Sequence, residues 1–407
     1  MRLDSPASLT RRSFLLSGGA LVAWAWMPRI VSAAAARDPR FVTIVLRGGL
    51  DGLAAVAPVG DPDYAALRGA NAIPAKGAGG APALDGFFRL NPAMPVLADL
   101  YRRGEALVVH AVATPYRERS HFDGQDVLES GEAGPGAARS GWLNRALAVL
   151  PKGEPVTGRA ALAIGPAVPL IVRGEAPVVT LMAPGGFDAS EDSRRRLLDL
   201  YTHTDPELAA RFAEGLDLRA RLAEANGMAP ADARPGAARN AGRNAGRLLA
   251  LADGPRIGAI GLNGWDTHRA EGLVDGQLGR ALGELDQTLG GLRDSLGADA
   301  WRDTVVAVVT EFGRTARMNG TEGTDHGTAT VAFVVGGAVA GGRVIADWPG
   351  LGTRALYQRR DLAPTTDLRA VLKGLLADHL GVPRRLLDTV VFPGSAGVAP
   401  LGGLVRA

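Results

Sequence analysis

The sequence predicts an α/β fold in which a mostly parallel central sheet carries helices on both faces. Three observations favour this class. Continuous β-prone apolar runs, typical of strands buried on both faces, recur along the chain, as at 41–46 and 305–309. Segments with apolar residues at helical spacing alternate with them, as at 274–296. Polar, glycine-rich loops follow several of the apolar runs, where open α/β sheets bind their ligands.

The first part of the chain supplies two of the buried strands and two helices. Apolar residues recur one turn apart after Pro95, which suits the first turn of a helix, and Gly131 is a typical helix end. Residues 69–86 are rich in Ala, Gly and Pro and predict a loop. The expected elements are a strand at 41–46, a helix at 95–103, a strand at 106–112 with a core His110, and a helix over 125–130.

The remaining part continues the alternation of strands and helices. An insertion is expected at about 185–250, because residues 227–247 repeat Ala, Gly, Asn and Arg and carry little core; they would form a surface helix start or a mobile linker. The expected elements are strands at 161–164 and 170–172, helices at 192–200 and 206–224, a strand at 256–262, a helix at 274–296 with leucines at helical spacing, strands at 305–309 and 330–335, and a helix to Leu380 that Thr366 or Asp367 caps.

The first 36 residues are predicted to be a targeting segment outside the fold. Thr10-Arg11-Arg12-Ser13-Phe14-Leu15-Leu16 is a twin-arginine export motif, and small residues at 32–36 offer cleavage sites. The apolar stretch 15–26 is shorter than the ~20 residues that span a bilayer, so we expect no stable membrane anchor. The mature protein would be periplasmic or secreted, after meeting the twin-arginine translocase as a partner during export.

Charge and cysteine content exclude several function classes. The whole chain carries a net charge of +3, and residues 1–36 hold four Arg against one Asp, so this segment accounts for all of the excess. The mature part is therefore near neutral, and no nucleic-acid partner is expected. The absence of Cys excludes disulfides, a thiolate nucleophile and a Cys-ligated metal.

Four loop motifs carry carboxylates, imidazoles or a hydroxyl after predicted strands. Carboxylate oxygen and imidazole nitrogen are ligands for a divalent metal, and the Asp-His pairs are notable because the chain has only six His. We expect them to meet at one rim of the sheet and hold one or two ions, with Zn, Mn, Mg, Ca and Fe not distinguished. The predicted metal ligands are Asp51, Asp266, His268, Asp325 and His326.

Each motif also has a purely structural interpretation. Asp325 and His326 would pair by hydrogen bonds within a loop, as would Asp266 and His268, and Asp51 would be a turn residue before glycine. Ser120 is a candidate nucleophile or a helix cap. His121 would be a ligand or a base. Arg314 would be an anion clamp and Glu311 a carboxylate at or behind the metal, or both would make structural contacts.

These motifs, in this order, resemble a bacterial family of twin-arginine-exported proteins known only as a domain of unknown function, within the alkaline phosphatase-like superfamily. The resemblance covers essentially the whole mature chain and implies one alkaline phosphatase-like domain over 37–407. The matching stretches are Arg47-Gly48-Gly49-Leu50-Asp51-Gly52, Ser120-His121-Phe122, Gly264-Trp265-Asp266-Thr267-His268, Thr310-Glu311-Phe312-Gly313-Arg314-Thr315, Gly323-Thr324-Asp325-His326-Gly327, Gly336-Gly337-Ala338-Val339 with Gly341-Gly342, and Thr366-Asp367-Leu368-Arg369.

The resemblance implies a role for each matching residue. Asp51 takes the place of the first-strand metal ligand, and Asp325 with His326 matches the pair that shares its metal with the nucleophile, here Ser120. Asp266 and His268 match the pair for a second metal, at a narrower spacing than the superfamily uses and without its third His. The catalytic candidates are Ser120, His121 and Arg314.

The implied function is hydrolysis of phosphate or sulfate esters by a metal-dependent, exported enzyme whose partner is a small-molecule oxyanion ester. Whether catalysis is retained stays open. The alternative is a non-catalytic exported protein that binds a metal or anion on the same scaffold. The narrow spacing of Asp266 and His268, together with the missing third His, favours that alternative.

Overall fold

The computed structural model describes residues 37–74, 80–136, 138–150, 160–165, 168–181, 191–210, 212–213, 216 and 236–406. The predicted signal segment 1–36 and parts of the predicted insertion lie outside the described residues. Residues Asp38–Ala407 form one compact unit. Across the described ranges, no helix is both long enough and apolar enough to cross a membrane.

A nine-stranded mixed sheet, mostly parallel, forms the centre of this unit, as predicted. Its order is β10-β4-β9-β8-β1-β7-β5-β6, with β11 paired to β4. Only β9 is antiparallel to its neighbours in this sheet, β4 and β8. The strands are β1 (Arg40–Leu46), β4 (Ala106–Ala113), β5 (Ala161–Ile164), β6 (Val178–Leu181), β7 (Ile257–Leu262), β8 (Thr304–Thr310), β9 (Thr330–Val335), β10 (Val344–Ile345) and β11 (Thr366–Asp367); β2 (Val56–Ala57) and β3 (Arg89–Leu90) pair separately.

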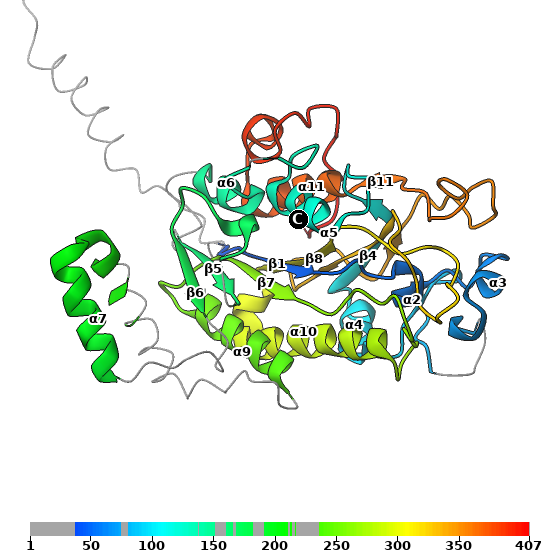
Figure 1. The fold of residues 1–407 in the computed structure, drawn as a ribbon, viewed down its shortest axis with the longest axis horizontal. Helices are drawn as coiled ribbons and strands as arrows, with labels where there is room; N and C mark the ends of the chain where they lie inside the picture. The colour runs from blue at the N-terminus through cyan, green and yellow to red at the C-terminus, as the bar shows by residue number, and fades with distance from the viewer. Residues whose placement is uncertain are drawn as a thin grey trace, which may run out of the picture. The chain divides into compact units, whose positions relative to one another are not determined.

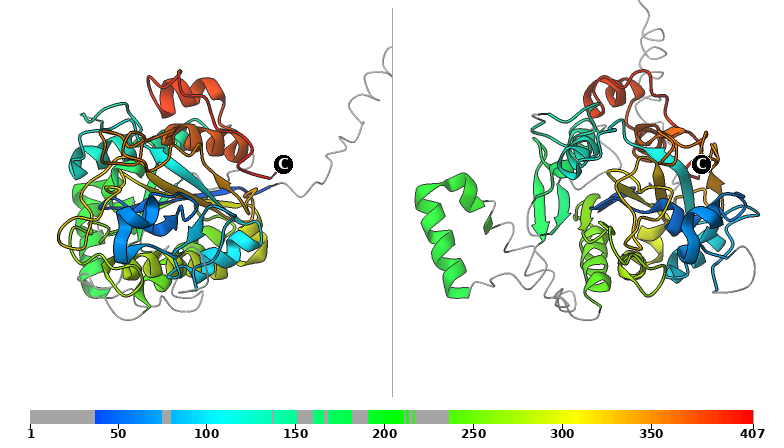
Figure 2. Two further views of the ribbon diagram at one scale, coloured as in Figure 1. Left: turned by 90° about the vertical axis from the view of Figure 1, so that its right-hand side faces the viewer. Right: turned by 45° about the vertical axis from the view of Figure 1, so that its right-hand side comes forward.

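Helices cover both faces of the sheet, which gives three layers (Figure 1). In Figure 1, α4, α9 and α10 lie below the sheet and α5, α6 and α11 above it, and Figure 2 shows the same layering from two other sides. The helices are α2 (Gly52–Ala55), α3 (Tyr64–Arg68), α4 (Pro95–Arg102), α5 (His121–Ser130), α6 (Trp142–Ala148), α7 (Glu191–Thr204), α9 (Ala237–Ala250), α10 (Gln277–Arg302), α11 (Leu368–Leu380) and α12 (Arg384–Leu386), with single turns η1 (Gly69–Asn71), η2 (Leu170–Val172) and η3 (Leu387–Val391).

Two hydrophobic cores lie on opposite faces of the sheet because side chains alternate along each strand. In β1, Val42 and Ile44 face one core, whereas Phe41 and Val45 face the other. The first core also contains apolar residues of α4, α9 and α10, and the second contains those of α6 and α11. The continuous apolar runs in the sequence therefore reflect strands that are covered on both faces, as predicted.

Two parts of the sequence-based description are wrong. The expected strand at 170–172 is the 3₁₀ turn η2, which Pro169 precedes; proline lacks the N–H that a sheet ladder needs. The segment 227–247, expected to carry little core, contains most of α9, which packs closely on α10. A Cβ at Gly242 would lie 2.1 Å from the carbonyl oxygen of Thr288, so glycine permits the close helix contact.

The other boundaries that fall within the described ranges hold to within about six residues, whereas most of the predicted helix at 206–224 lies outside the described residues. Helix α5 begins at His121, earlier than expected, and ends at Gly131, which adopts a left-handed conformation with φ of 74°. The side chain of Asp367 caps α11 by accepting a hydrogen bond from the backbone N–H of Arg369. Helix α10 is longer than expected and bends at Gly297.

His110 is a fully buried core residue, as predicted, and its environment requires a neutral ring. Its Nε2 lies 3.0 Å from the carbonyl oxygen of Val56, and its Nδ1 accepts a hydrogen bond from the N–H of Ala111 at 2.8 Å. The ring also stacks on Phe88. Burial lowers the pKa of His110 from 6.5 to about 4, because the interior disfavours the charged ring.

We therefore expect His110 to make stability fall with acid. Between pH 6.5 and 4 the unfolded chain binds a proton at this residue and the folded chain does not, so the free energy of unfolding should drop by about 3 kcal/mol from this group. Denaturant unfolding across this range, combined with NMR of the ring carbons, measures both effects. A His110 signal that titrates near pH 6.5 would contradict the assignment.

Candidate metal centre

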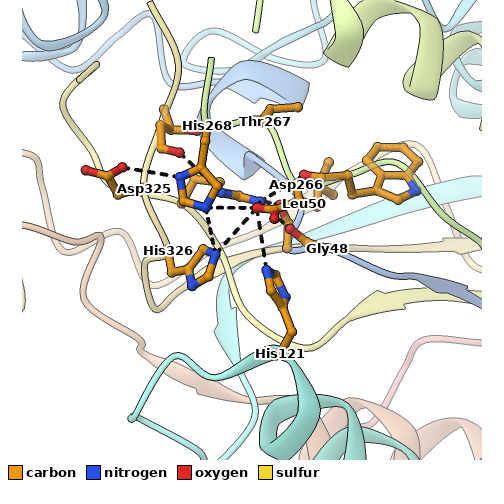
Figure 3. Close-up of polar contacts among 12 residues, drawn as sticks. Gly48, Leu50, His121, Asp266, Thr267, His268, Asp325 and His326 are labelled. Carbon is orange, nitrogen blue, oxygen red and sulfur yellow. Dashed lines mark hydrogen bonds and ion pairs between the residues drawn. The ribbon is translucent and has the colours of Figure 1, made fainter. Parts of the chain in front are cut away.

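The carboxyl ends of three neighbouring parallel strands bring the functional loops together. The end of β1, Leu46, pairs with Leu262 at the end of β7 and with Thr310 at the end of β8. The loops that leave these strands therefore start from the same rim, where open α/β sheets bind ligands. The first residue of α5, His121, reaches the same place from the helix layer that lies above the sheet in Figure 1, and Figure 3 shows its side chain directed at Asp266.

Asp266, His121 and His326 each present a ligand atom within 4.8 Å of the other two at this rim, and His268 adjoins Asp266 and His326. Oδ1 of Asp266 lies 3.1 Å from Nε2 of His268, 3.4 Å from Nε2 of His326 and 3.5 Å from Nε2 of His121. The Nε2 atoms of His268 and His326 are 2.9 Å apart. Ligands around a tetrahedral ion with bonds of about 2.0–2.1 Å lie about 3.3 Å from one another, so these spacings suit a metal. Figure 3 shows the side chains pointing toward one another.

The outer nitrogen of each histidine is held by an oxygen. Nδ1 of His121 lies 2.9 Å from Oε1 of Glu311, and Nδ1 of His268 lies 3.3 Å from Oδ1 of Asp325. Nδ1 of His326 lies 2.9 Å from the carbonyl oxygen of Arg119. A carbonyl only accepts, so this nitrogen of His326 carries the proton and its Nε2 lone pair faces inward. Metal-binding histidines are oriented in this way by their outer partners.

The inward nitrogens need a positive partner. Nε2 of His121 is buried and makes no hydrogen bond within the part of the chain that the structure describes. At 2.9 Å, two facing lone pairs of His268 and His326 repel unless a proton or a metal ion lies between them. The atoms present therefore fit a divalent ion held by His121, Asp266 and His326, with His268 beside it.

The ionisation states of Asp266 and His326 agree with this fit, whereas His121 is shifted toward its protonated form, which competes with a metal ion. Burial opposes the charge of Asp266, but the hydrogen bond from Arg314 outweighs it and lowers the pKa of the carboxyl. Burial lowers the pKa of His326, which favours its neutral form. The pKa of Glu311 is also lowered: burial opposes its charge, and the bonds from His121 and from backbone N–H groups overcome that effect. The hydrogen bond to Glu311 raises the pKa of His121.

Arg314, predicted as an anion clamp, lies buried beneath the cluster. Its Nε donates to the carbonyl oxygen of Gly49 at 2.9 Å and its Nη1 to that of Thr324 at 3.2 Å. Its Nη2 bonds the carbonyls of Gly48 and Trp265 and, at 2.5 Å, Oδ1 of Asp266. The guanidinium thus joins the three loops that follow β1, β7 and β8 and is directed at protein acceptors.

Asp51 lies apart from the converging group, in a buried ion pair. Its Oδ1 caps α2 by accepting from the N–H groups of Leu53 and Ala54, and its Oδ2 pairs with Arg68. Both charged side chains are almost completely inaccessible to solvent. Glu271 belongs to the same buried cluster, and its pKa is raised by burial first and by the charge of Asp51 second.

Ser120, predicted as a nucleophile, is the N-cap of α5. Its Oγ accepts a long hydrogen bond from the N–H of Asp123 at 3.5 Å, and its own N–H donates to the hydroxyl of Tyr116 at 3.2 Å. Ser120 immediately precedes His121, so its hydroxyl is at the amino-terminal end of α5, next to the residue of this helix that enters the cluster. The cap interpretation describes the contact observed, and the nucleophile role stays a prediction.

The sequence motifs did not distinguish inner from outer residues of the cluster. Asp325 contacts His268 rather than the convergent point and also accepts from Asn319 at 3.2 Å, whereas His121 reaches the centre. The sequence of an adjacent Asp-His pair does not show which of the two side chains points toward the centre of the cluster. The supporting carbonyl of Arg119 gave no sequence signal at all, because every residue has one.

We expect Asp51→Asn to affect stability rather than metal binding. The variant leaves Arg68 as a buried cation without its partner, which should lower the free energy of unfolding by about 3–5 kcal/mol. Denaturant unfolding and elemental analysis of the refolded protein measure the two quantities. Loss of metal from a variant of unchanged stability would contradict this expectation and restore Asp51 as a ligand.

Several solved structures resemble this chain at low identity. Phosphonate monoester hydrolase of Agrobacterium radiobacter is 12% identical, over 84% of this chain and 74% of that one, with a TM-score of 0.41. The C-terminal periplasmic domain of EcEptC from Escherichia coli, a complex with Zn, is 9% identical over 74% of each chain, with a TM-score of 0.38. A protein in the alkaline phosphatase superfamily from Vibrio parahaemolyticus is 13% identical, over 74% and 60%, with a TM-score of 0.29.

At TM-scores this low, these likenesses support no conclusion about activity. No curated protein matches the chain. The family model described as "Protein of unknown function (DUF1501)" matches residues 105–391, which is more than half of the sequence and spans the loops that carry His121, Asp266, His268 and His326. The chain therefore belongs to the DUF1501 family of proteins of unknown function.

Proposed function

We propose that this protein is a metal-dependent hydrolase of phosphate or sulfate esters with an alkaline phosphatase-like fold. One observation carries the proposal: Asp266, His121, His268 and His326 converge while the outer nitrogen of each histidine is already bound. Such preorganisation is typical of a metal site, because a purely structural histidine seldom leaves a buried nitrogen unpaired.

Three imidazoles and one carboxylate narrow the choice of metal. Nitrogen-rich sets suit zinc or iron better than magnesium or calcium, which prefer oxygen. The convergent atoms form one site, so we propose one ion per chain, in place of the two that the sequence allowed. When bound, such an ion polarises an ester oxygen and lowers the pKa of a bound water.

The protein groups around the site would bind and orient an oxyanion ester. About half of the side-chain surface of Asp266 and of His268 is accessible, which leaves the centre open on one side. The amino-terminal end of α5 adds the partial positive charge of its backbone N–H groups at the same place. Glu311 fixes the ring of His121, and Arg314 fixes Asp266, so neither ligand has to reorient when substrate arrives.

The nucleophile is a water molecule or Ser120. Ser120 sits beside His121 at the helix end, but its hydroxyl accepts the N–H of Asp123 and would have to leave this cap to attack. We also propose that the protein acts outside the cytoplasm, exported by the twin-arginine translocase through the segment 1–36. This second statement is supported by the sequence motif alone.

A non-catalytic metal-binding protein is the second candidate, and the same site supplies its supporting observation. His268 adjoins the group formed by His121, Asp266 and His326, and if it moved in as a fourth ligand the set would be closed, as in structural zinc sites. In addition, the guanidinium of Arg314 is directed at protein acceptors and the hydroxyl of Ser120 caps α5. The two candidates share the metal and differ in turnover.

Purified mature protein should contain about one equivalent of zinc or iron and should hydrolyse at least one member of a panel of phosphate monoesters, phosphodiesters and sulfate esters. His121→Ala and His326→Ala should each lose metal and activity. His203→Ala removes an exposed histidine of α7 and is the matched control, so it should keep both. Bound metal without turnover on any ester would favour the second candidate, and absence of metal would overturn both.

Glu311→Gln tests the support of His121. The amide keeps the shape of the side chain but loses the charge that holds Nδ1, so metal affinity should fall by about 10- to 100-fold. Competition with a chelator of known affinity measures the change. Glu284→Gln, on the exposed face of α10, is the control. Equal affinity in both variants would show that Glu311 has only a packing role.

A further inference from the structure

A pocket lies beside the metal centre, along the same rim of the sheet. Its volume is about 370 Å³. It opens where β1, β7 and β5 end, with Arg47, Asn263 and Gly165 contributed by the loops after these strands. Gln125 and Glu129 of α5 line the pocket, and so does Leu170 of η2. A molecule whose reacting group sits at the metal could therefore extend into this pocket.

Hydrogen bonds connect the pocket directly to the metal cluster. Gln125 lines the pocket, and its Nε2 donates to Oε1 of Glu311 at 3.3 Å. The same oxygen lies 2.9 Å from Nδ1 of His121. It also accepts the N–H of Gly48 at 2.8 Å, and Gly48 follows the pocket residue Arg47. One side chain, Glu311, thus separates the pocket from a candidate ligand.

The charges of the pocket balance. Arg47 pairs with Glu129 at 2.5 Å, and the second carboxylate oxygen of Glu129 accepts the N–H of Ile171 at 3.0 Å. The other two charged lining residues are Arg173 and Asp126. Two cations and two anions leave no net charge, so the pocket offers no general attraction to an anionic or a cationic group.

Polar side chains in the lining can nevertheless form hydrogen bonds with a bound molecule. The amide groups of Gln125 and Asn263 add both donors and acceptors. The apolar part of the wall is aliphatic, from Ile164 and Leu170 among others, and the lining residues include no aromatic ring. An apolar occupant would make no hydrogen bond to the amide groups of Gln125 and Asn263 in the lining, whereas a hydroxyl group can.

We propose that this pocket binds an uncharged, hydroxyl-rich part of the substrate, such as a sugar or polyol, whose ester group reaches the metal. The proposal rests on the proposed hydrolase function, because the metal centre defines which end reacts. Hydroxyl groups both donate and accept, which matches a lining that contains amide, guanidinium and carboxylate groups without net charge. The volume suits one ring rather than a polymer segment.

Saturation-transfer NMR with the metal-loaded mature protein tests the proposal without turnover. The neutral probes are glucose, galactose and myo-inositol, and the comparison probes are glucuronate, glucosamine and cyclohexanol. At least one neutral probe should bind saturably and at least fivefold more tightly than every comparison probe. Tighter binding of a charged or apolar probe would overturn the proposal, as would the absence of saturable binding by all probes.

Asn263→Trp places a large side chain at the pocket from an exposed position, so folding should be preserved. It should weaken binding of the neutral probe at least tenfold, with metal content unchanged. Gln287→Trp, at an exposed position of α10, is the matched control and should bind like the unmodified protein. If binding of the neutral probe weakened equally in both variants, or in neither, the probe would not bind in this pocket.

Binding and hydrolysis measured on the same samples distinguish a failure of the pocket assignment from a failure of the proposed hydrolase function. Ester hydrolysis without binding of any neutral probe would refute the pocket assignment and leave the hydrolase intact. Binding of a neutral probe by a metal-loaded protein that hydrolyses none of the esters would refute the hydrolase and show a hydroxyl-binding site on a metal protein.

Discussion

The buried guanidinium of Arg314 is the interaction on which the candidate site depends. It bonds carbonyl oxygens in the loops after β1 and β7 and in the loop that carries His326, and it also holds Asp266. A buried cation must keep its acceptors because losing them costs desolvation energy without compensation. This requirement fixes three loops of very different sequence position relative to one another, and it does so directly beneath the convergent side chains.

Two groups of residues then support the cluster from opposite sides. Below it, Glu271 accepts hydrogen bonds from Thr267 and Thr324, which are the neighbours of Asp266 and Asp325. Around it, Glu311, Asp325 and the Arg119 carbonyl turn the three histidines inward. The acidic residues whose roles the sequence could not distinguish therefore occupy different positions in the structure. Asp266 reaches the centre, Asp325 and Glu311 orient rings, and Asp51 with Glu271 belongs to the buried layer underneath.

The site and the neighbouring pocket share one rim because the strands that frame them are parallel. β1, β7 and β8 end beside one another at the cluster, and β5 continues the rim toward the pocket. Helix α5 borders both: His121 from its first turn enters the cluster, and Gln125, one turn later, lines the pocket and bonds Glu311. Reaction and recognition would thus be coupled through a helix and a single buried carboxylate rather than through a mobile segment.

The sequence by itself determined the α/β class and the mostly parallel sheet, since strands covered on both faces must be apolar throughout. It also placed Asp266, His268 and His326 at strand-end loops, because parallel strands end at one edge. Only the tertiary structure decided that His121 joins them, that Asp51 pairs with Arg68, and that α9 packs tightly on α10. The reason is physical: local pattern fixes where a residue leaves the sheet, whereas the direction of its side chain depends on buried partners far away in the chain.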